Sequence, residues 1–95
     1  MKTGLVLGLL LLGTHAALAA PPTAEQKTEF HRVCMSIAQD ETLCSCKAEA
    51  TDKLIDSDFM AIVIDSMRGK TLAPEYAVRY NDYVAHSNQI CKPNY

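Results

Sequence analysis

The sequence lacks an excess of positive charge, and it lacks any apolar run long enough to cross a bilayer. Its 95 residues carry 9 Lys and Arg against 11 Asp and Glu, a formal net charge of −2. A mildly acidic chain does not attract phosphate backbones, which argues against nucleic acid as a partner. The longest apolar run, residues 5–12, is far shorter than the ~20 residues of a transmembrane helix. We therefore expect no nucleic-acid partner and no stable membrane anchor.

The sequence also lacks the motifs that carry most enzymatic chemistry. It contains no glycine-rich phosphate loop, and neither His31 nor His86 has a nucleophile at a recognisable spacing. Asp56-x-Asp58 is similar to the opening of a calcium loop, but the glycine and distal glutamate of such a loop are missing. We interpret these acids as helix caps. The sequence predicts a protein that is not an enzyme and has no cofactor and no metal.

Residues 1–19 have the three parts of a cleavable secretory signal peptide. Lys2 supplies the positive charge, the apolar run follows it, and Ala17 and Ala19 place small residues at the −3 and −1 positions. No cysteine lies near this site, which argues against a lipid anchor. We expect cleavage after Ala19, a single mature domain over residues 20–95, and a periplasmic or secreted location.

Apolar residues in this domain recur at three- and four-residue spacing, which is typical of amphipathic helices. Thr23 and Asp40 are suited to begin helices, Gly69 to end one, and Pro74 to occupy the first position of another. Lys47 is expected on a solvated face. No two segments alternate apolar and polar residues as a hairpin would. We predict an all-α domain with helices near residues 23–39, 41–55, 57–69 and 74–91, of which the third is the most apolar and therefore central.

The four cysteines indicate a disulfide framework, since an even number in a short exported chain is typical of one. They are Cys34, Cys44, Cys46 and Cys91. Side chains two positions apart on a helix point about 200° apart, so a Cys44–Cys46 bond would need local unwinding. Both other pairings connect Cys34 and Cys91 to different cysteines of the second helix. We favour Cys34–Cys44 with Cys46–Cys91, and the opposite assignment stays open.

The cysteine positions also predict the topology. Cys34, Cys44 and Cys46 cluster around the Asp40 turn, whereas a plain up-down-up-down bundle would place Cys91 at the opposite end. A second helix of ~15 residues would then separate the partners by roughly 20 Å, far beyond the ~7 Å limit between bridged Cα atoms. We therefore predict a small irregular four-helix domain stapled by two disulfides, not a simple up-down-up-down bundle. The last helix should run antiparallel to the second, and the third should cross the others steeply.

The first functional hypothesis is a non-enzymatic binding protein, an inhibitor or immunity-type partner of another protein. Tyr76, Tyr80 and Tyr83 fall on one face of the last predicted helix, and tyrosine is a preferred residue at binding surfaces. The same face carries Cys91, which favours packing in the core. The three tyrosines are therefore a candidate partner-binding surface, and the alternative is that they pack in the core.

Two alternatives come from other classes of protein. An acid- or stress-responsive periplasmic chaperone would need a fold that loosens as its carboxylates are protonated and exposes apolar surface. A Cu(I) or zinc carrier would use Cys44-x-Cys46 as soft ligands. The first alternative depends on acid-sensitive contacts, and the second depends on free thiols.

Overall fold

The computed structural model describes residues 19–93, and these form four α-helices and one 3-10 turn with no strand. The helices confirm the all-α prediction. Ala19, the last residue of the predicted signal peptide, is the first described residue, and residues 1–18 lie outside the described part of the chain. The last predicted helix begins with a 3-10 turn at Pro74 and becomes α-helical three residues later. The elements are α2 (Ala24–Ala38), α3 (Glu41–Leu54), α4 (Ser57–Met67), η2 (Pro74–Tyr76) and α5 (Ala77–Ile90).

Side chains cap the starts of α2, α3 and α4. The Thr23 hydroxyl accepts a hydrogen bond from the Gln26 amide at 3.0 Å, and the Gln26 side chain accepts one from the Thr23 amide at 3.0 Å. The Asp40 carboxylate accepts from the Leu43 amide at 3.0 Å, and Asp56 caps α4 in the same way. The predicted caps at Thr23 and Asp40 are confirmed, and Asp56 is a cap as expected.

The chain changes direction between α4 and α5. Gly69 follows the end of α4 with a φ of 96°, in the left-handed region that glycine adopts without strain. Residues 70–73 then lead to η2. Gly69 therefore ends α4, as predicted, and Pro74 begins the next element, as predicted.

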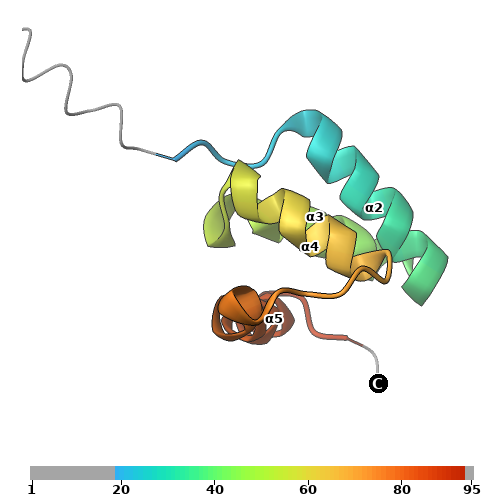
Figure 1. Cartoon of the computed structure of the whole chain (residues 1–95). Coiled ribbons are helices and arrows are strands. Elements are labelled where there is room, and N and C mark those ends of the chain that lie inside the picture. Colours follow the sequence, from blue (N-terminus) through green and yellow to red (C-terminus); the bar gives the residue numbers. More distant parts are fainter. Residues whose placement is uncertain (1–18, 94–95) are drawn as a thin grey trace, which may run out of the picture.

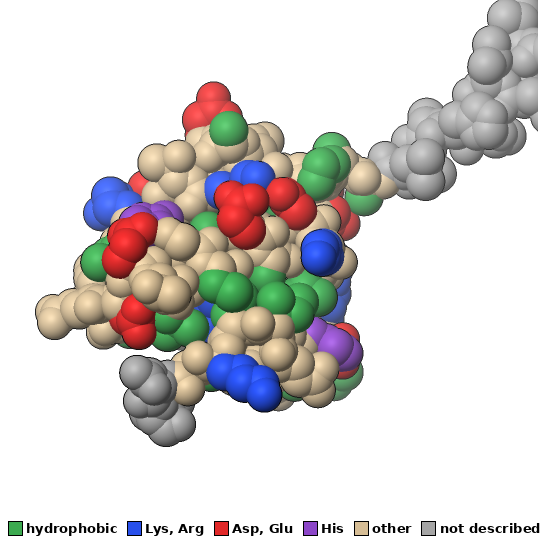
Figure 2. Space-filling model, turned by 180° about the vertical axis from the view of Figure 1, so that it is seen from behind, with side chains coloured by type: hydrophobic (Ala, Val, Ile, Leu, Met, Phe, Trp, Pro, Cys, Tyr) green, Lys and Arg blue, Asp and Glu red, His purple; other side chains and the backbone are tan. Residues whose placement is uncertain are grey.

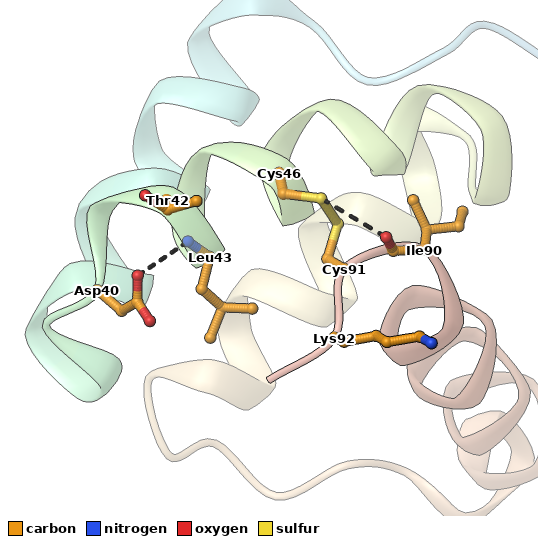
Figure 3. Close-up of a pocket in the computed structure, with 7 residues that line it drawn as sticks. All are labelled: Asp40, Thr42, Leu43, Cys46, Ile90, Cys91 and Lys92. Atoms are coloured by element: carbon orange, nitrogen blue, oxygen red, sulfur yellow. Dashed lines mark hydrogen bonds between the residues drawn. A yellow bond between two sulfur atoms is a disulfide. The ribbon is translucent and has the colours of Figure 1, made fainter. Parts of the chain in front are cut away.

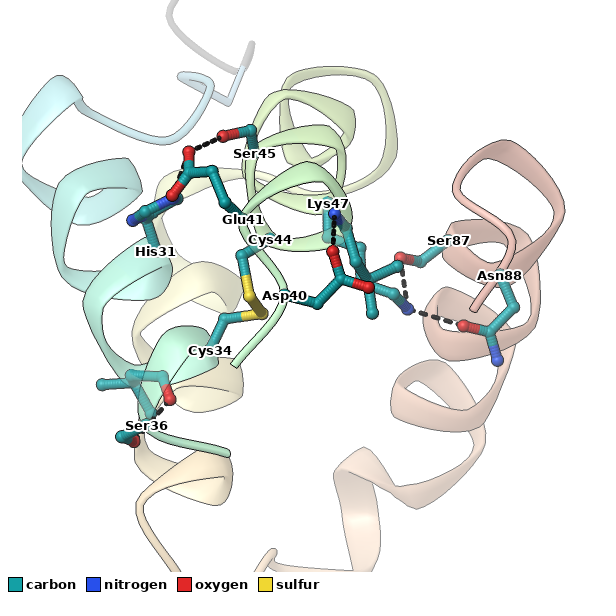
Figure 4. The surroundings of a disulfide bond; sticks show 12 residues. His31, Cys34, Ser36, Asp40, Glu41, Cys44, Ser45, Lys47, Ser87 and Asn88 are labelled. Carbon is teal, nitrogen blue, oxygen red and sulfur yellow. Dashed lines mark hydrogen bonds and ion pairs between the residues drawn. A yellow bond between two sulfur atoms is a disulfide. The ribbon is translucent and has the colours of Figure 1, made fainter. Parts of the chain in front are cut away.

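α5 crosses the other helices steeply. In Figure 1 it is viewed nearly along its axis, while α2 and α4 are seen from the side. In Figure 4 the view is close to the axis of α3, and α5 is seen from the side. The domain is therefore not an up-down-up-down bundle, as predicted. The expectation that α5 runs antiparallel to α3 and that α4 makes the steep crossing was wrong, because a bridge at one end of α5 fixes its position but not its direction.

The core lies mainly between α2, α3 and α4, and α4 supplies its most deeply buried apolar side chains, as expected of the most apolar helix. In position, α2 packs closely against both α3 and α4, and α3 packs against both α2 and α5. Phe59, Met60 and Val63 of α4 are at most 1% exposed. Tyr83 is the member of the core that α5 provides. Thr51 is fully buried, and its hydroxyl donates to the Ala48 carbonyl oxygen at 2.7 Å, so its burial leaves no unpaired polar group.

Two disulfides connect the helices, with the favoured pairing. Cys34–Cys44 joins α2 to the start of α3, and Cys46–Cys91 joins α3 to the residue after α5, with Cα–Cα distances of 5.7 and 5.8 Å. The bridged cysteines are 10 and 45 residues apart in the sequence. In the chain-entropy model, loops of these sizes contribute roughly 3 and 4 kcal/mol, which is large beside the net stability of a small domain.

Candidate functional site

Both members of the Cys-x-Cys motif are bound in disulfides, and each belongs to a different one. A disulfide sulfur carries no thiolate, so this oxidised form does not offer the soft ligands that a Cu(I) or zinc carrier needs. The described residues also bring together no group of three or more histidine, cysteine and acidic side chains that would suit a metal ion. The motif serves instead to attach α3 to two different neighbours.

An open groove of about 520 Å³ lies beside the Cys46–Cys91 disulfide. One wall comes from the start of α3 and the other from the end of α5, and the disulfide connects the two (Figure 3). The Cys46 sulfur lies 4.0 Å from the Ile90 carbonyl oxygen, which brings the backbone of the second wall close to the bridge. The groove is lined by Asp40, Thr42, Leu43, Cys46, Ile90, Cys91 and Lys92.

The groove combines apolar side chains with one charge of each sign. Ile90 is 49% exposed, although it is a large hydrophobic residue, and Leu43 is half-buried. Asp40 contributes a carboxylate and Lys92 an exposed ammonium group. Figure 2 shows the molecule from behind, with hydrophobic side chains exposed between α5 and the other helices and charged side chains around them. The groove can therefore hold an apolar group and orient it by charge.

The tyrosine stripe packs largely against the core. Tyr83 is 7% exposed, so it presents almost no surface to a partner. Tyr76 and Tyr80 are half-buried against the core, and the Tyr76 ring meets Phe59 edge-on with centroids 6.1 Å apart. Tyr76 and Tyr80 keep part of their surface and stay candidates for partner binding.

Sequence reasoning missed the groove, which lies at the C-terminal end of α5. The sequence analysis singled out Cys91 at this end of the helix and not Ile90, which directly precedes it. The exposure of Ile90 could have been suspected from the polar residues around it, since Gln89 precedes it in the last turn of α5 and Lys92 follows shortly after the helix.

A second polar cluster joins α2 to α3 beside the Cys34–Cys44 disulfide (Figure 4). The Glu41 carboxylate accepts from the Ser45 hydroxyl at 2.6 Å and lies 3.1 Å from His31 Nε2. The hydrogen bond from Ser45 and the contact with His31 lower the pKa of Glu41. The Ser45 hydroxyl donates to the Glu41 carboxylate and does not contact His31, so the cluster lacks the serine–histidine contact of a catalytic triad. It acts as a tether between two helices.

Comparisons with known proteins add nothing to this geometry. No family model, curated protein or solved structure matches the chain. Within the described residues, no helix has the length and apolar character needed to cross a membrane.

Burial raises the pKa of Tyr83 to about 12, and the Ser87 hydroxyl offsets part of that effect. A raised folded-state pKa means that Tyr83 stabilises the fold below pH 10 and that this stability is lost as the pH rises toward 12. We predict that absorbance at 295 nm after a rapid pH jump shows a tyrosine ionisation near pH 12. The Tyr83→Phe variant should lose only this late step. The absence of an ionisation step near pH 12, with helical circular dichroism intact, would contradict the burial of Tyr83.

Proposed function

We propose that this protein is a small periplasmic or secreted binding module, of inhibitor or immunity type, that recognises another protein without enzymatic activity. The signal-like residues 1–19 and the two disulfides support export, because disulfides persist in oxidising compartments. The observation that carries the binding proposal is the groove beside the Cys46–Cys91 bridge, with Ile90 exposed in its wall.

The composition of the groove supports a protein partner. Protein interfaces commonly combine apolar with polar groups, and the groove is lined by the apolar residues Leu43 and Ile90 together with the charged residues Asp40 and Lys92. An open groove suits a side chain presented by a partner's surface, whereas small-molecule sites enclose most of the ligand. We expect the partner to contribute an apolar side chain flanked by charged groups that complement Asp40 and Lys92.

The disulfide also favours binding by holding both walls in place before the partner arrives. Cys46 fixes the α3 wall and Cys91 fixes the α5 wall. A preorganised site loses less conformational freedom on association, so more of the contact energy contributes to affinity. This covalent connection supports a binding role for the groove as well as a role in stability.

The proposal is tested by site-specific photocrosslinking in the cell that exports the protein. A photoreactive side chain at position 90 should give an adduct of one defined mass, and the Leu43→Lys substitution should abolish it. With the partner purified, Ile90→Lys should weaken binding about tenfold or more.

Val78 provides the matched control, because it is a large hydrophobic residue on the same helix and is 83% exposed. The photoreactive side chain at position 78 should give no adduct, and Val78→Lys should leave the affinity unchanged. Ile90→Lys and Val78→Lys should each change the free energy of unfolding by no more than about 0.5 kcal/mol, since both side chains are exposed. Equal crosslinking at positions 78 and 90, or none at position 90, would refute the groove as the interface.

One set of contacts favours the chaperone as a second candidate function. Ion pairs between helices join Lys27 to Asp52 at 2.9 Å, Arg68 to Glu29, and Arg79 to Asp56 at 3.5 Å, and His31 contacts Glu41 at 3.0 Å. Each uses a carboxylate, so acid removes all of them together. The lowered pKa of Glu41 means that its contribution is present at neutral pH and is lost as the pH falls below about 4.5.

Binding of an apolar dye distinguishes this candidate from the binding module. A chaperone of this kind should bind the dye reversibly below about pH 3 and then suppress the aggregation of an unfolded client protein. A binding module stapled by two disulfides should keep its near-ultraviolet circular dichroism and show little dye binding over the same range. Dye binding with no effect on client aggregation would indicate acid unfolding alone and would count against the chaperone.

A further inference from the structure

Lys47 lies in an unusual position for a lysine of this chain. It was expected on a solvated face, yet it is half-buried, and its Nζ reaches from α3 to α5 (Figure 4). There it donates to Ser87 Oγ at 3.2 Å and to Asn88 Oδ1 at 2.6 Å. Both acceptors are neutral. An ammonium group has three N–H donors, so one remains for another acceptor.

The charge of Lys47 has no carboxylate partner among the described residues. Most basic side chains there pair with an acid, and the other two lysines without such a partner, Lys53 and Lys92, are exposed to water. Burial lowers the pKa of Lys47. A partly desolvated cation without a counterion is unfavourable, and an anion beside it would relieve that cost.

A half-enclosed cavity of about 130 Å³ adjoins this ammonium group. Lys47 and Ser87 form its polar side, and Tyr80 and Tyr83 also line it. Its apolar side comes from three helices and includes Phe30, Val63, Met67 and Val84. A cavity of about 150 Å³ holds one benzene molecule, so this somewhat smaller, half-enclosed one has room for an alkyl chain of about five carbon atoms, with the charged end of the ligand outside it.

We propose that this cavity binds a short aliphatic carboxylate of about six carbons, with its chain among Val63, Met67 and Val84 and its carboxylate on the Lys47 ammonium group. One cation matches one negative charge. The apolar walls exclude a purely inorganic anion as the preferred ligand, and the small volume excludes a peptide main chain. The cavity shares no residue with the groove beside Cys46–Cys91, so the two sites are independent.

The test is a ¹H–¹⁵N NMR titration of the disulfide-bonded protein with hexanoate. We expect saturable shifts of the amides of Lys47, Val84 and Ser87. Acetate lacks the chain and hexylammonium reverses the charge, so each should bind at least about tenfold more weakly, as expected for the loss of a charged hydrogen bond or of apolar burial. Equal binding of hexylammonium and hexanoate, or no saturable shift with hexanoate, would overturn the proposal.

Variants then assign the charge and the chain to their residues. Lys47→Met keeps a long side chain without the charge and should weaken hexanoate binding about tenfold or more. Val84→Phe should also remove binding by filling the cavity. Lys53→Met is the matched control, since Lys53 is an exposed lysine on the same helix. An unchanged affinity in Lys47→Met, or an equal loss in Lys53→Met, would contradict the role of Lys47. If Lys47→Met does not fold, the comparison of the three ligands on the native protein decides.

Discussion

The position of α5 depends on the covalent bond between Cys46 and Cys91. This helix provides one buried aromatic residue to the core, Tyr83, and the hydrogen bonds from Lys47 add a second attachment to α3. The bond closes a 45-residue span and contributes roughly 4 kcal/mol in the chain-entropy model, a large part of the 5–15 kcal/mol net stability of ordinary domains. The groove and the Lys47 cavity both have walls from α3 and α5. Both candidate binding sites therefore depend on this bond.

Sequence reasoning predicted the features that are set locally. Helix starts at Thr23 and Asp40 follow from side chains that satisfy amides three residues away, and Gly69 follows from a backbone conformation that other residues disfavour. The disulfide pairing was narrowed by a similar local argument, because residues two apart on a helix face different neighbours. Such interactions span few residues, so the sequence shows them directly.

The features that sequence reasoning missed arise where α5 meets α3. The angle between these helices depends on how whole side-chain surfaces fit, which no spacing reveals. That angle leaves Ile90 exposed. It also brings Lys47 within hydrogen-bonding distance of Ser87 and Asn88, although the helical pattern predicted that Lys47 would be solvated. For the tyrosine stripe, the sequence argument for core packing holds at Tyr83. This residue shares the inward face of α5 with Cys91, and its burial follows from the Cys46–Cys91 bridge.

Partial reduction followed by differential alkylation and mass spectrometry tests the pairing most directly. Only Ser45 separates Cys44 from Cys46, so proteolysis alone does not resolve the two bridges. We predict that every molecule with one bridge reduced carries the first label either on Cys46 and Cys91 or on Cys34 and Cys44. Molecules labelled at Cys44 and Cys91, or at Cys34 and Cys91, would show that α5 is attached elsewhere and would contradict the position of both binding sites.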